Sequence, residues 1–405
     1  MESSKGVIVV GGGPVGLTIA LKLGQVGLAV RLFERGDILH QEPRASTLHA
    51  ATLDMLSDLG VYNLIEPLSI VCPVMRYWDR QSGKLIAEFD HEVLKDEVSH
   101  PWALQCEQDK LSRALFAMVG QCKNVEVVTG ATVVACNQNS EEVRVTVRDV
   151  AGTETHHSGS YLIGADGARS TVREQLDIGF EGFTYPERFL IISTSHDFMT
   201  NGGFAYRNYI LDPEEWAALF KISWNGPPGV WRMVTPARAD ETAESLSLEE
   251  TAQSRLQKFR PLAPQYDIPF YKWYTVDQRV ASRFRQDRIV LAGDAAHLNN
   301  PLGAMGLNSG LHDAFNLSEK LIAIVKKEAS PDLLDRYERQ RRHVAVVHVQ
   351  AATMADKQNM EHRDPDKRQT YLADLRKRAE DPALAKDYLM KASLVESLRD
   401  AASVQ

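Results

Sequence analysis

A glycine-rich loop near the amino terminus constrains the fold of this chain more than any other feature. The β-branched run 7–10 predicts a buried strand, residues 14–27 predict a helix, and residues 29–33 predict a second strand that ends at Glu34. Between the first strand and the helix lies the sequence Gly-Gly-Gly-Pro-Val-Gly, residues 11–16. This order of elements predicts a βαβ unit of the α/β class.

The glycines and the terminal acid of this unit suit the binding of a dinucleotide. Gly11 permits a tight turn, Gly13 lets the backbone approach a pyrophosphate, and Gly16 allows close packing of the helix. Glu34 follows Gly16 by 18 residues, where a carboxylate accepts hydrogen bonds from a ribose diol. A purely structural glycine turn is the alternative, and the motif alone does not separate FAD from NAD.

Two later segments repeat the pattern of a strand, a glycine turn and the start of a helix. They span residues 161–173 and 288–297, and residues 299–308 form a second glycine-rich approach to a helix. Asp166 and Asp294 each precede a predicted helix, where a single aspartate is more often a helix cap than a ligand. Taken as a set with the first motif, the two acids favour a cofactor site.

These three motifs resemble the signatures of the FAD-dependent aromatic hydroxylases, the single-component flavoprotein monooxygenases of the para-hydroxybenzoate hydroxylase type. The resemblance spans residues 6 to about 330. It implies a Rossmann-like FAD-binding domain with an inserted, mostly β substrate domain and C-terminal helices. The expected boundaries are 1–75, 102–179 and 276–330 for the FAD-binding domain, 76–101 and 180–275 for the substrate domain, and 331–405 for the helical segment.

The resemblance also implies which residues bind FAD. Glu34 and the first glycine loop would hold the adenosine diphosphate part, Arg44 and Gln108 the flavin side, and Asp294 the ribityl chain. The full implied set is Gly11, Gly13, Pro14, Gly16, Glu34, Arg35, Arg44, Gln108, Asp166, Asp294, Pro301, Gly303, Gly306, Leu307 and Asn308. Where relatives often read Pro-x-Gly-Gly-Gln-Gly, residues 301–306 of this chain read Pro-Leu-Gly-Ala-Met-Gly.

The activity implied by the resemblance is hydroxylation of an activated ring, either a phenol or a hydroxylated N-heteroaromatic compound. NAD(P)H would reduce the flavin, and O2 would react through a flavin C4a-hydroperoxide. The chain has no second GxGxxG within a βαβ unit. NAD(P)H is therefore expected as a transient co-substrate, beside FAD as the bound cofactor and a small aromatic substrate.

The aromatic-rich segment 180–275 is the expected source of the substrate pocket. Its candidates for the pocket are Tyr206, Arg207, Tyr209, Trp224, Trp231 and Arg232. Each of them also suits an ordinary β-sheet core or surface. His49 could act as a base near the ring, although a histidine on a helix surface is the simpler interpretation. The catalytic residue is left unassigned, with His49, Tyr206, Tyr209 and Arg232 as candidates.

Charge and cysteine content exclude several other classes of protein. With 54 acidic and 46 basic residues the net charge is −8, which disfavours nucleic acid and anionic lipid as partners. The four cysteines contain no CxxC pair, so we expect free thiols and no metal site. Glycines and a proline interrupt the most apolar window, 7–23, and no signal peptide is evident, which predicts a cytoplasmic protein without a membrane span. Both a monomer and a homodimer remain open.

Three alternatives to hydroxylation share the expected fold. A flavin-dependent halogenase is disfavoured because no Trp-x-Trp-x-x-Pro segment occurs. An oxidase or dehydrogenase is not excluded by the motifs. A non-catalytic binding relative would give a colourless protein, whereas a flavoprotein is yellow.

The remaining elements are predicted from periodicity. Helices are expected at 45–59, 106–119 and 307–327, and packed helices over 332–405. Segments 125–134 and 143–149 predict an antiparallel ribbon.

Overall fold

A six-stranded sheet carries the glycine loop and both later motifs. The structure is a computed structural model and describes residues 6–38, 45–238, 240–262 and 264–405. The strand order is β20-β21-β12-β1-β2-β8, and all neighbours are parallel except β20 and β21. The strands are β1 (Val7–Val10), β2 (Val30–Glu34), β8 (Val125–Thr129), β12 (Tyr161–Gly164), β20 (Arg285–Gln286) and β21 (Ile289–Leu291). Parallel pairing brings the carboxyl ends of β1, β2, β12 and β21 to one edge, where ligands of such sheets bind.

Three helices, α1 (Pro14–Gln25), α4 (Gln108–Val119) and α9 (Met305–Val325), pack together on this sheet. Helix α1 packs against α4 and against α9. The helix predicted at 106–119 is therefore present but begins two residues later, and the helix predicted at 307–327 lies two residues earlier in the chain. The α/β fold with a Rossmann-like unit is confirmed.

The predicted ribbon at 125–149 is wrong at its first strand. Gly130 has a φ of +66°, a left-handed turn that ends β8 and separates it from β9 (Thr132–Gln138). Strand β8 joins the parallel sheet, whereas β9 pairs with β10 (Val143–Arg148) and β10 pairs with β11 (Glu154–Gly159), both antiparallel. The chain thus changes sheets at a single glycine.

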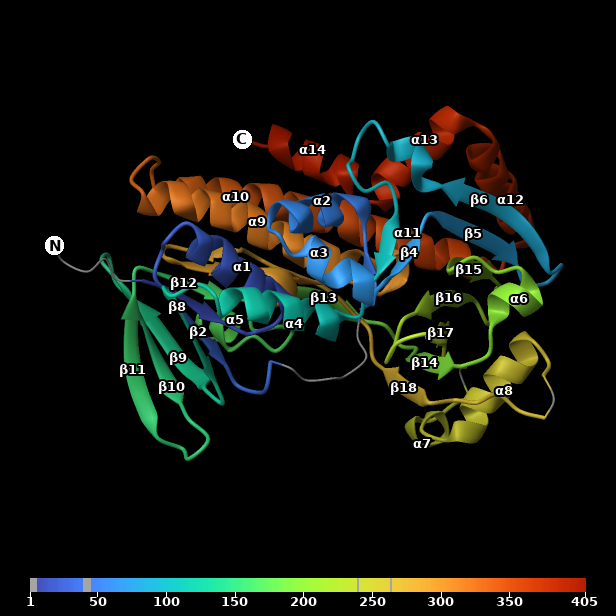
Figure 1. Ribbon diagram of the computed structural model, residues 1–405, viewed down its shortest axis with the longest axis horizontal. Helices are drawn as coiled ribbons and strands as arrows, with labels where there is room; N and C mark the ends of the chain where they lie inside the picture. Colours follow the sequence, from blue (N-terminus) through green and yellow to red (C-terminus); the bar gives the residue numbers. More distant parts are fainter. Residues whose placement is uncertain (1–5, 39–44, 239, 263) are drawn as a thin grey trace.

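A seven-stranded sheet forms the other end of the molecule (Figure 1). Its order is β18-β14-β17-β16-β15-β5-β6. The strands are β5 (Val74–Asp79), β6 (Lys84–Asp90), β14 (Phe189–Thr194), β15 (Arg207–Leu211), β16 (Ala217–Ile222), β17 (Val230–Pro236) and β18 (Phe270–Tyr274). All seven lie in segments 74–90 and 189–274, close to the predicted insertions. The exact domain boundaries stay a prediction.

The expectation of a mostly β insertion misses three helices. They are α6 (Phe198–Gly202), α7 (Ala243–Leu246) and α8 (Glu249–Phe259). Helix α8 has acidic residues in its first turn and Lys258 in its last, which favours a helix through the macrodipole. Helix α8 buries Ala252 and Leu256, which are four residues apart, against the seven-stranded sheet.

Two small sheets connect the large ones. One is β3 (Thr47–Leu48), β7 (Ala103–Gln105) and β4 (Ile70–Cys72), and the other is β13 (Phe180–Thr184), β19 (Asp277–Ala281) and β22 (His297–Leu298). Because residues 47–48 pair with β7, the helix predicted from 45 begins only at α2 (Ala50–Asp58). A short helix, α3 (Tyr62–Ile65), follows α2, and α5 (Thr171–Gln175) follows the second motif.

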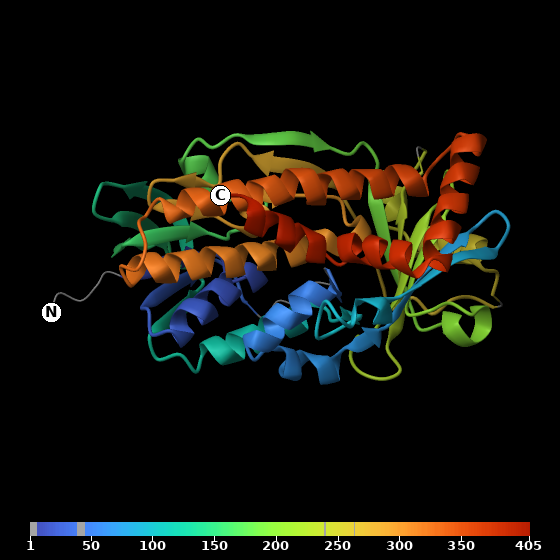
Figure 2. The same ribbon diagram turned by 90° about the horizontal axis from the view of Figure 1, so that it is seen from above.

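The C-terminal residues form the packed helices that the sequence predicts. They are α10 (Leu333–His343), α11 (Ala351–Met360), α12 (Pro365–Glu380), α13 (Pro382–Ala392) and α14 (Val395–Ser403). In the view from above, these orange and red helices extend along the long axis of the molecule from one end to the other (Figure 2). They therefore reach both large sheets.

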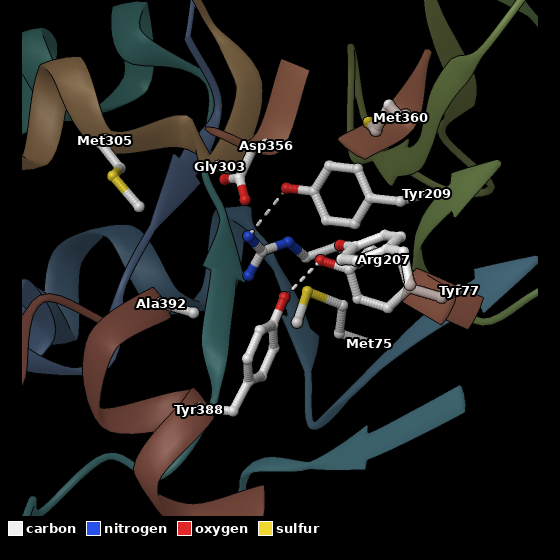
Figure 3. Close-up of a pocket in the computed structure, with 11 residues that line it drawn as sticks. Met75, Tyr77, Arg207, Tyr209, Gly303, Met305, Asp356, Met360, Tyr388 and Ala392 are labelled. Carbon is white, nitrogen blue, oxygen red and sulfur yellow. Dashed lines mark hydrogen bonds between the residues drawn. The ribbon is translucent and has the colours of Figure 1, made fainter. Parts of the chain in front are cut away.

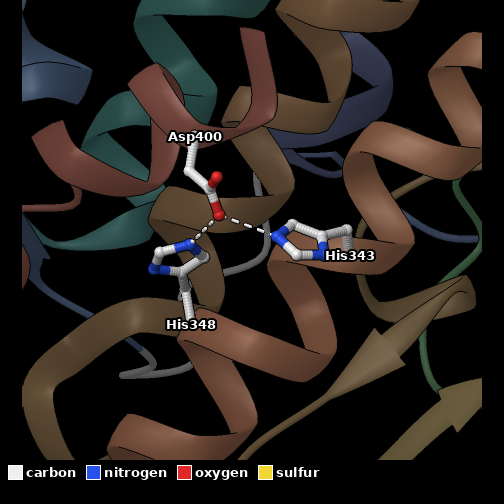
Figure 4. A group of neighbouring side chains, drawn as sticks. All are labelled: His343, His348 and Asp400. Atoms are coloured by element: carbon white, nitrogen blue, oxygen red, sulfur yellow. Dashed lines mark hydrogen bonds and ion pairs between the residues drawn. The ribbon is translucent and has the colours of Figure 1, made fainter. Parts of the chain in front are cut away.

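A π-helical segment, Val344–Gln350, joins α10 to α11 and turns two histidines toward α14. His343 and His348 are five residues apart, the spacing that a π-helix places on one face. The Nε2 atoms of both lie 2.7 Å from the same Oδ2 of Asp400 (Figure 4). Within the described ranges this is the one group of three potential metal ligands, and its hydrogen bonds connect α14 to the rest of the helical layer.

Within the described part of the chain, no helix combines the length and the apolar character needed to cross a membrane.

A buried carboxylate fixes the third motif to the helices. Asp313 of α9 accepts hydrogen bonds from the Gly293 amide at 2.9 Å, from His297 Nε2 at 2.8 Å and from Arg341 Nε at 2.5 Å. All three side chains are buried, and Arg341 belongs to α10. Burial alone would raise the pKa of Asp313, but mainly the charge of Arg341 lowers it to about 2. His297 therefore holds the Gly293 turn to α9 and is a structural residue.

We predict that Asp313→Asn lowers the free energy of unfolding by about 3–5 kcal/mol, because it leaves Arg341 as an uncompensated buried charge. Urea unfolding at neutral pH measures this change. A folded-state pKa below the unfolded value stabilises the protein above the unfolded pKa, and this contribution is lost as the pH falls toward 2. The difference between wild type and variant should therefore shrink in acid, and an equal difference at pH 7 and pH 3 would contradict the assignment.

Candidate active site

A groove of about 570 Å³ lies at the carboxyl edge of the parallel sheet. The first motif contributes Gly11, Gly13, Pro14, Glu34 and Arg35 to its walls. Helix α4 contributes Gln108, and the second and third motifs contribute Asp166 and Asp294. The structure thus brings three distant segments together around one groove.

The glycine loop has the shape that a phosphate requires. Gly11 has a φ of +107°, and a Cβ there would lie 2.3 Å from the carbonyl oxygen of Ala165. Gly13 precedes α1 without any side-chain cap, and a Cβ on it would meet no atom within 4 Å. The first amides of α1 are therefore available to an anion in the groove. Gly16 does not line the groove: a Cβ on it would lie 2.0 Å from the Gly11 carbonyl oxygen, so it permits the loop to pack on the helix.

Glu34 is held against this loop by two backbone amides. Its Oε2 accepts a hydrogen bond from the Gly12 amide at 2.6 Å, and its Oε1 accepts one from the Gly36 amide at 2.8 Å. The carboxylate is thereby fixed at the wall of the groove, where the sequence predicts a ribose.

The two aspartates of the later motifs differ in their surroundings. Asp166 accepts hydrogen bonds from the Oγ of Ser170, the N-cap of α5, at 2.6 Å and from the Val172 amide at 3.1 Å, so it stabilises the first turn of α5, and burial raises its pKa. Asp294 has an exposed side chain at the groove wall, in the turn that Asp313 holds. Asp294 is thus the better placed of the two to meet a ligand.

The start of α9 is ordered by side chains that the sequence assigns to the cofactor. The Asn308 amide donates to the carbonyls of Thr47 and Ala304 and accepts from the His49 amide at 2.9 Å. Its side chain therefore holds the loop rather than facing a ligand. Pro301, Gly306 and Leu307 lie in the same turn and outside the groove. Arg44 lies outside the described residues.

His49 is buried, which corrects the interpretation of it as a helix-surface residue. It precedes α2 and has no exposed surface, because the strand β3 draws it inward beneath α9. Its Nε2 lies 2.7 Å from the Gly303 carbonyl oxygen, so this nitrogen carries the proton and donates. Burial, and next the charge of Arg207, hold the pKa of His49 well below its usual value, and the imidazole is neutral.

A second, closed pocket of about 20 Å³ lies where the start of α9 meets the seven-stranded sheet and the C-terminal helices (Figure 3). Four phenols surround it: Tyr77, Tyr209, Tyr371 and Tyr388. Three thioethers, of Met75, Met305 and Met360, add flexible apolar walls. Gly303 of the turn before α9 and two charged residues, Arg207 and Asp356, complete the polar part.

Arg207 is a buried cation at this pocket. Only 3% of its surface is exposed, and its guanidinium donates to the Tyr209 hydroxyl at 3.0 Å. No described carboxylate forms an ion pair with Arg207. Asp356 lies across the pocket, close enough for the charge of Arg207 to oppose the rise that burial causes in the pKa of its carboxyl group. A buried cation in such surroundings favours an anionic ligand.

The alternation of side chains along β15 determines which of the predicted residues face the pocket. Alternate residues of a strand share a face, and Arg207 and Tyr209 of β15 both line the pocket. Tyr206 and Trp231 pack instead in the hydrophobic core beneath α8. The prediction that Tyr206 and Trp231 line the substrate pocket is therefore wrong, and both belong to the hydrophobic core.

Trp224 and Arg232 lie beside α4 rather than in the pocket. The Trp224 amide donates to Glu107 Oε1 at 2.5 Å. Burial lowers the pKa of Arg232 to about 10, against the opposing charge of Glu107. Neither residue lines the closed pocket.

The sequence interpretation misses most of the pocket, because β5, the start of α9 and the C-terminal helices supply the missing residues. Asp356 and Met360 come from α11, Tyr371 from α12 and Tyr388 from α13. The only local signal is the spacing of Asp356 and Met360, which puts them on one helix face. Nothing in the sequence indicates that this face meets β15.

Comparison with known proteins identifies the family. Residues 5–352 match the family model described as an FAD binding domain. The chain belongs to the FAD-dependent aromatic monooxygenases. It is 33% identical over 393 residues to a para-nitrophenol 4-monooxygenase of Pseudomonas sp. (strain WBC-3), with 96% of each chain covered.

Two further comparisons agree with this family. The chain is 33% identical to the 6-hydroxy-3-succinoylpyridine 3-monooxygenase HspB of Pseudomonas putida (strain DSM 28022 / S16), covering 90% of this chain and 91% of that protein. The crystal structure of the p-nitrophenol 4-monooxygenase PnpA from Pseudomonas putida DLL-E4 superposes with a TM-score of 0.91 at 32% identity, covering 98% and 99% of the two chains. The resemblance on which the sequence interpretation rests is confirmed.

We predict that Asp294→Ala weakens FAD retention by about 1.5–3 kcal/mol, because a ribityl hydroxyl would lose a charge-assisted acceptor. Flavin fluorescence released on serial dilution measures this loss. Glu328→Ala, an exposed carboxylate beyond the far end of α9, is the control and should retain FAD as the wild type does. Full FAD occupancy of Asp294→Ala at high dilution would show that the side chain does not contact the cofactor.

Proposed function

We propose that this protein hydroxylates a small single-ring phenol or hydroxypyridine, using FAD, NAD(P)H and O2. In the balanced reaction one NAD(P)H, one proton and one O2 convert the substrate into its hydroxylated product, NAD(P)+ and water. Bound FAD supplies the redox chemistry that activates O2. The observation that carries the proposal is the closed pocket with its buried cation at the start of α9.

The groove suits FAD in its chemistry. Uncapped amides of α1 suit a pyrophosphate, Glu34 suits a ribose, and the exposed carboxylate of Asp294 suits the ribityl hydroxyls. The groove is the one site of this kind that the sequence motifs predict, so NAD(P)H is proposed to act transiently.

A single ring would require less rearrangement of this pocket than the larger polycyclic substrates that the sequence leaves open. A space of about 20 Å³ holds little more than one water molecule. The three methionines can adapt to a planar ring, because thioether side chains fill irregular spaces at low cost. A fused polycyclic ligand would need movement of α11 to α13 as well. The relatives named above are monooxygenases of a nitrophenol and a hydroxypyridine.

Arg207 is proposed to stabilise the ionised form of the substrate. A phenolate ring is richer in electrons than a phenol, which favours attack by an electrophilic oxygen donor. The buried guanidinium supplies a fixed positive charge with little exposure to solvent, where such a charge is most effective. The surrounding tyrosines can donate further hydrogen bonds to ring substituents.

The other activities on this fold predict different outcomes of one experiment. The purified protein is supplied with NAD(P)H and O2 labelled with oxygen-18 and screened with 4-nitrophenol, 4-methylphenol and hydroxypyridines. Hydroxylation predicts a yellow protein, substrate-stimulated NAD(P)H oxidation and one labelled oxygen in the product. NAD(P)H consumption without label in any product indicates an oxidase or dehydrogenase, and a colourless protein indicates a binding relative.

We predict that Arg207→Met raises the KM for 4-nitrophenol at pH 8 by roughly thirtyfold or more, because loss of one partner of a buried charge pair costs about 2–5 kcal/mol. Steady-state NAD(P)H oxidation measures the change, with FAD content checked by absorbance. Arg376→Met, an exposed arginine of α12, is the matched control and should leave KM unchanged. An unchanged KM in Arg207→Met would mean that the substrate anion binds elsewhere.

A further inference from the structure

We propose that Asp356 is the base that accepts the hydroxyl proton of the substrate as the ring binds beside Arg207. This inference rests on the proposed function and assigns a catalytic residue to it. Asp356 lies on α11, outside every motif by which the sequence indicates a flavin site.

The carboxylate of Asp356 lies between the turn that contains Gly303 and the guanidinium of Arg207. Its Oδ2 is 3.1 Å from the position that a Cβ on Gly303 would take. In Figure 3 the carboxylate points from the Gly303 turn toward Arg207, with Tyr209 beside the guanidinium. A ring held between Gly303 and Arg207 would therefore place its hydroxyl near both the cation and the carboxylate.

No other lining side chain of the described pocket suits this role. Asp356 is its one carboxylate, and the remaining polar groups are Arg207 and four phenols. The hydroxyls of Tyr77 and Tyr388 are 2.6 Å apart and hydrogen-bonded to each other. Burial raises the pKa values of Tyr77, Tyr371 and Tyr388. Their hydroxyls therefore stay protonated, so they can donate hydrogen bonds but cannot act as the base.

The charged and titratable groups around Asp356 suit a base that works near neutral pH. Arg207 of β15 faces it, and so do Tyr77 of β5, Tyr371 of α12 and Tyr388 of α13. Burial raises the pKa of Asp356 to about 6, while the charge of Arg207 opposes this shift. The group is therefore ionised at neutral pH and still basic enough to take a proton.

The proton transfer leaves the net charge of the closed pocket unchanged. The O–H bond of the substrate breaks, its electron pair stays on the substrate oxygen, and the proton moves to a carboxylate oxygen of Asp356. Before transfer the pocket holds the Arg207 cation, the Asp356 anion and a neutral phenol. Afterwards it holds the same cation, a neutral carboxylic acid and a phenolate. A buried site tolerates such an exchange better than the creation of a new unpaired charge.

His49 is the alternative base and is less suited to the role. It does not line the closed pocket, and its Nε2 proton is held by the Gly303 carbonyl. Burial holds the pKa of its imidazole well below the usual value, which makes it a weak base at neutral pH.

The test compares wild type and Asp356→Asn on phenols of graded acidity, with 4-nitrophenol, 4-cyanophenol, 4-chlorophenol and 4-methylphenol as probes at pH 8. A base is needed most by the phenols that are neutral in solution. We expect kcat for 4-methylphenol to fall about a hundredfold and kcat for 4-nitrophenol to fall less than tenfold. Asp366→Asn, an exposed acid in the first turn of α12, is the control and should match wild type on every phenol.

A second readout follows the proton itself. Binding of 4-nitrophenolate at pH 8 should take up about one proton in wild type, because the bound anion occupies Arg207 and raises the proton affinity of Asp356. Asp356→Asn should take up none. Calorimetry in two buffers of different ionisation enthalpy measures this number, and a purely structural role of Asp356 would not change it.

The outcomes separate this inference from the proposed function. If wild type hydroxylates the phenols but Asp356→Asn loses the same factor on all four, or takes up protons as wild type does, the assignment of Asp356 is wrong and the proposed function stands. If wild type hydroxylates none of them and binds none of them, both are wrong.

Discussion

The positive charge of Arg207 lies inside the protein at a pocket with room for little more than a water molecule, and the arrangement of the site depends on it. A charge in such a place is unfavourable unless an anion or a set of hydrogen bonds compensates it. Tyr209 supplies one hydrogen bond, and Asp356 supplies a carboxylate across the pocket. An anionic substrate oxygen would complete the arrangement. The electrostatics of the pocket therefore favour the ionised form of the ring that hydroxylation requires.

One buried carboxylate joins the turn that lines the cofactor groove to the helix that begins at this pocket. Asp313 holds the Gly293 turn, His297 and Arg341 together, and so fixes the third motif to α9 and α10. Asn308 then fixes the first turn of α9 to the Thr47 backbone and the His49 amide. Asp294 in the Gly293 turn thus lines the groove, whereas Met305 at the start of the 21-residue helix α9 lines the pocket, with α11 on its far side.

Local patterns predict the parts of this site that depend on backbone shape. The glycine loop, the acid at the end of β2 and the two later turns are read from spacing, because each needs particular residues at fixed positions of a strand–turn–helix unit. The groove is assembled from those residues. The same reasoning fails at Gly130, where one left-handed residue moves the chain to another sheet, and at residues 243–259, where helices interrupt a β-rich segment.

The substrate pocket depends on long-range packing, which a single sequence does not reveal. Arg207 and Tyr209 are among the predicted residues, but so is Tyr206, which directly precedes β15 and packs in the core instead. Asp356 lies in a charged tail with no motif, and its role arises because α11 packs against β15 and the Gly303 turn. His49 is predicted on a surface and is buried, since two residues of β3 precede its helix.

The most direct test of this account is a crystal structure of the FAD-loaded protein with 4-nitrophenol bound under anaerobic conditions. The account predicts that the phenolic oxygen lies within hydrogen-bond distance of both the Arg207 guanidinium and the Asp356 carboxyl, with the ring beside the Gly303 turn. A ring bound with its oxygen directed away from Arg207, or bound outside the pocket between β15 and α11, would contradict it.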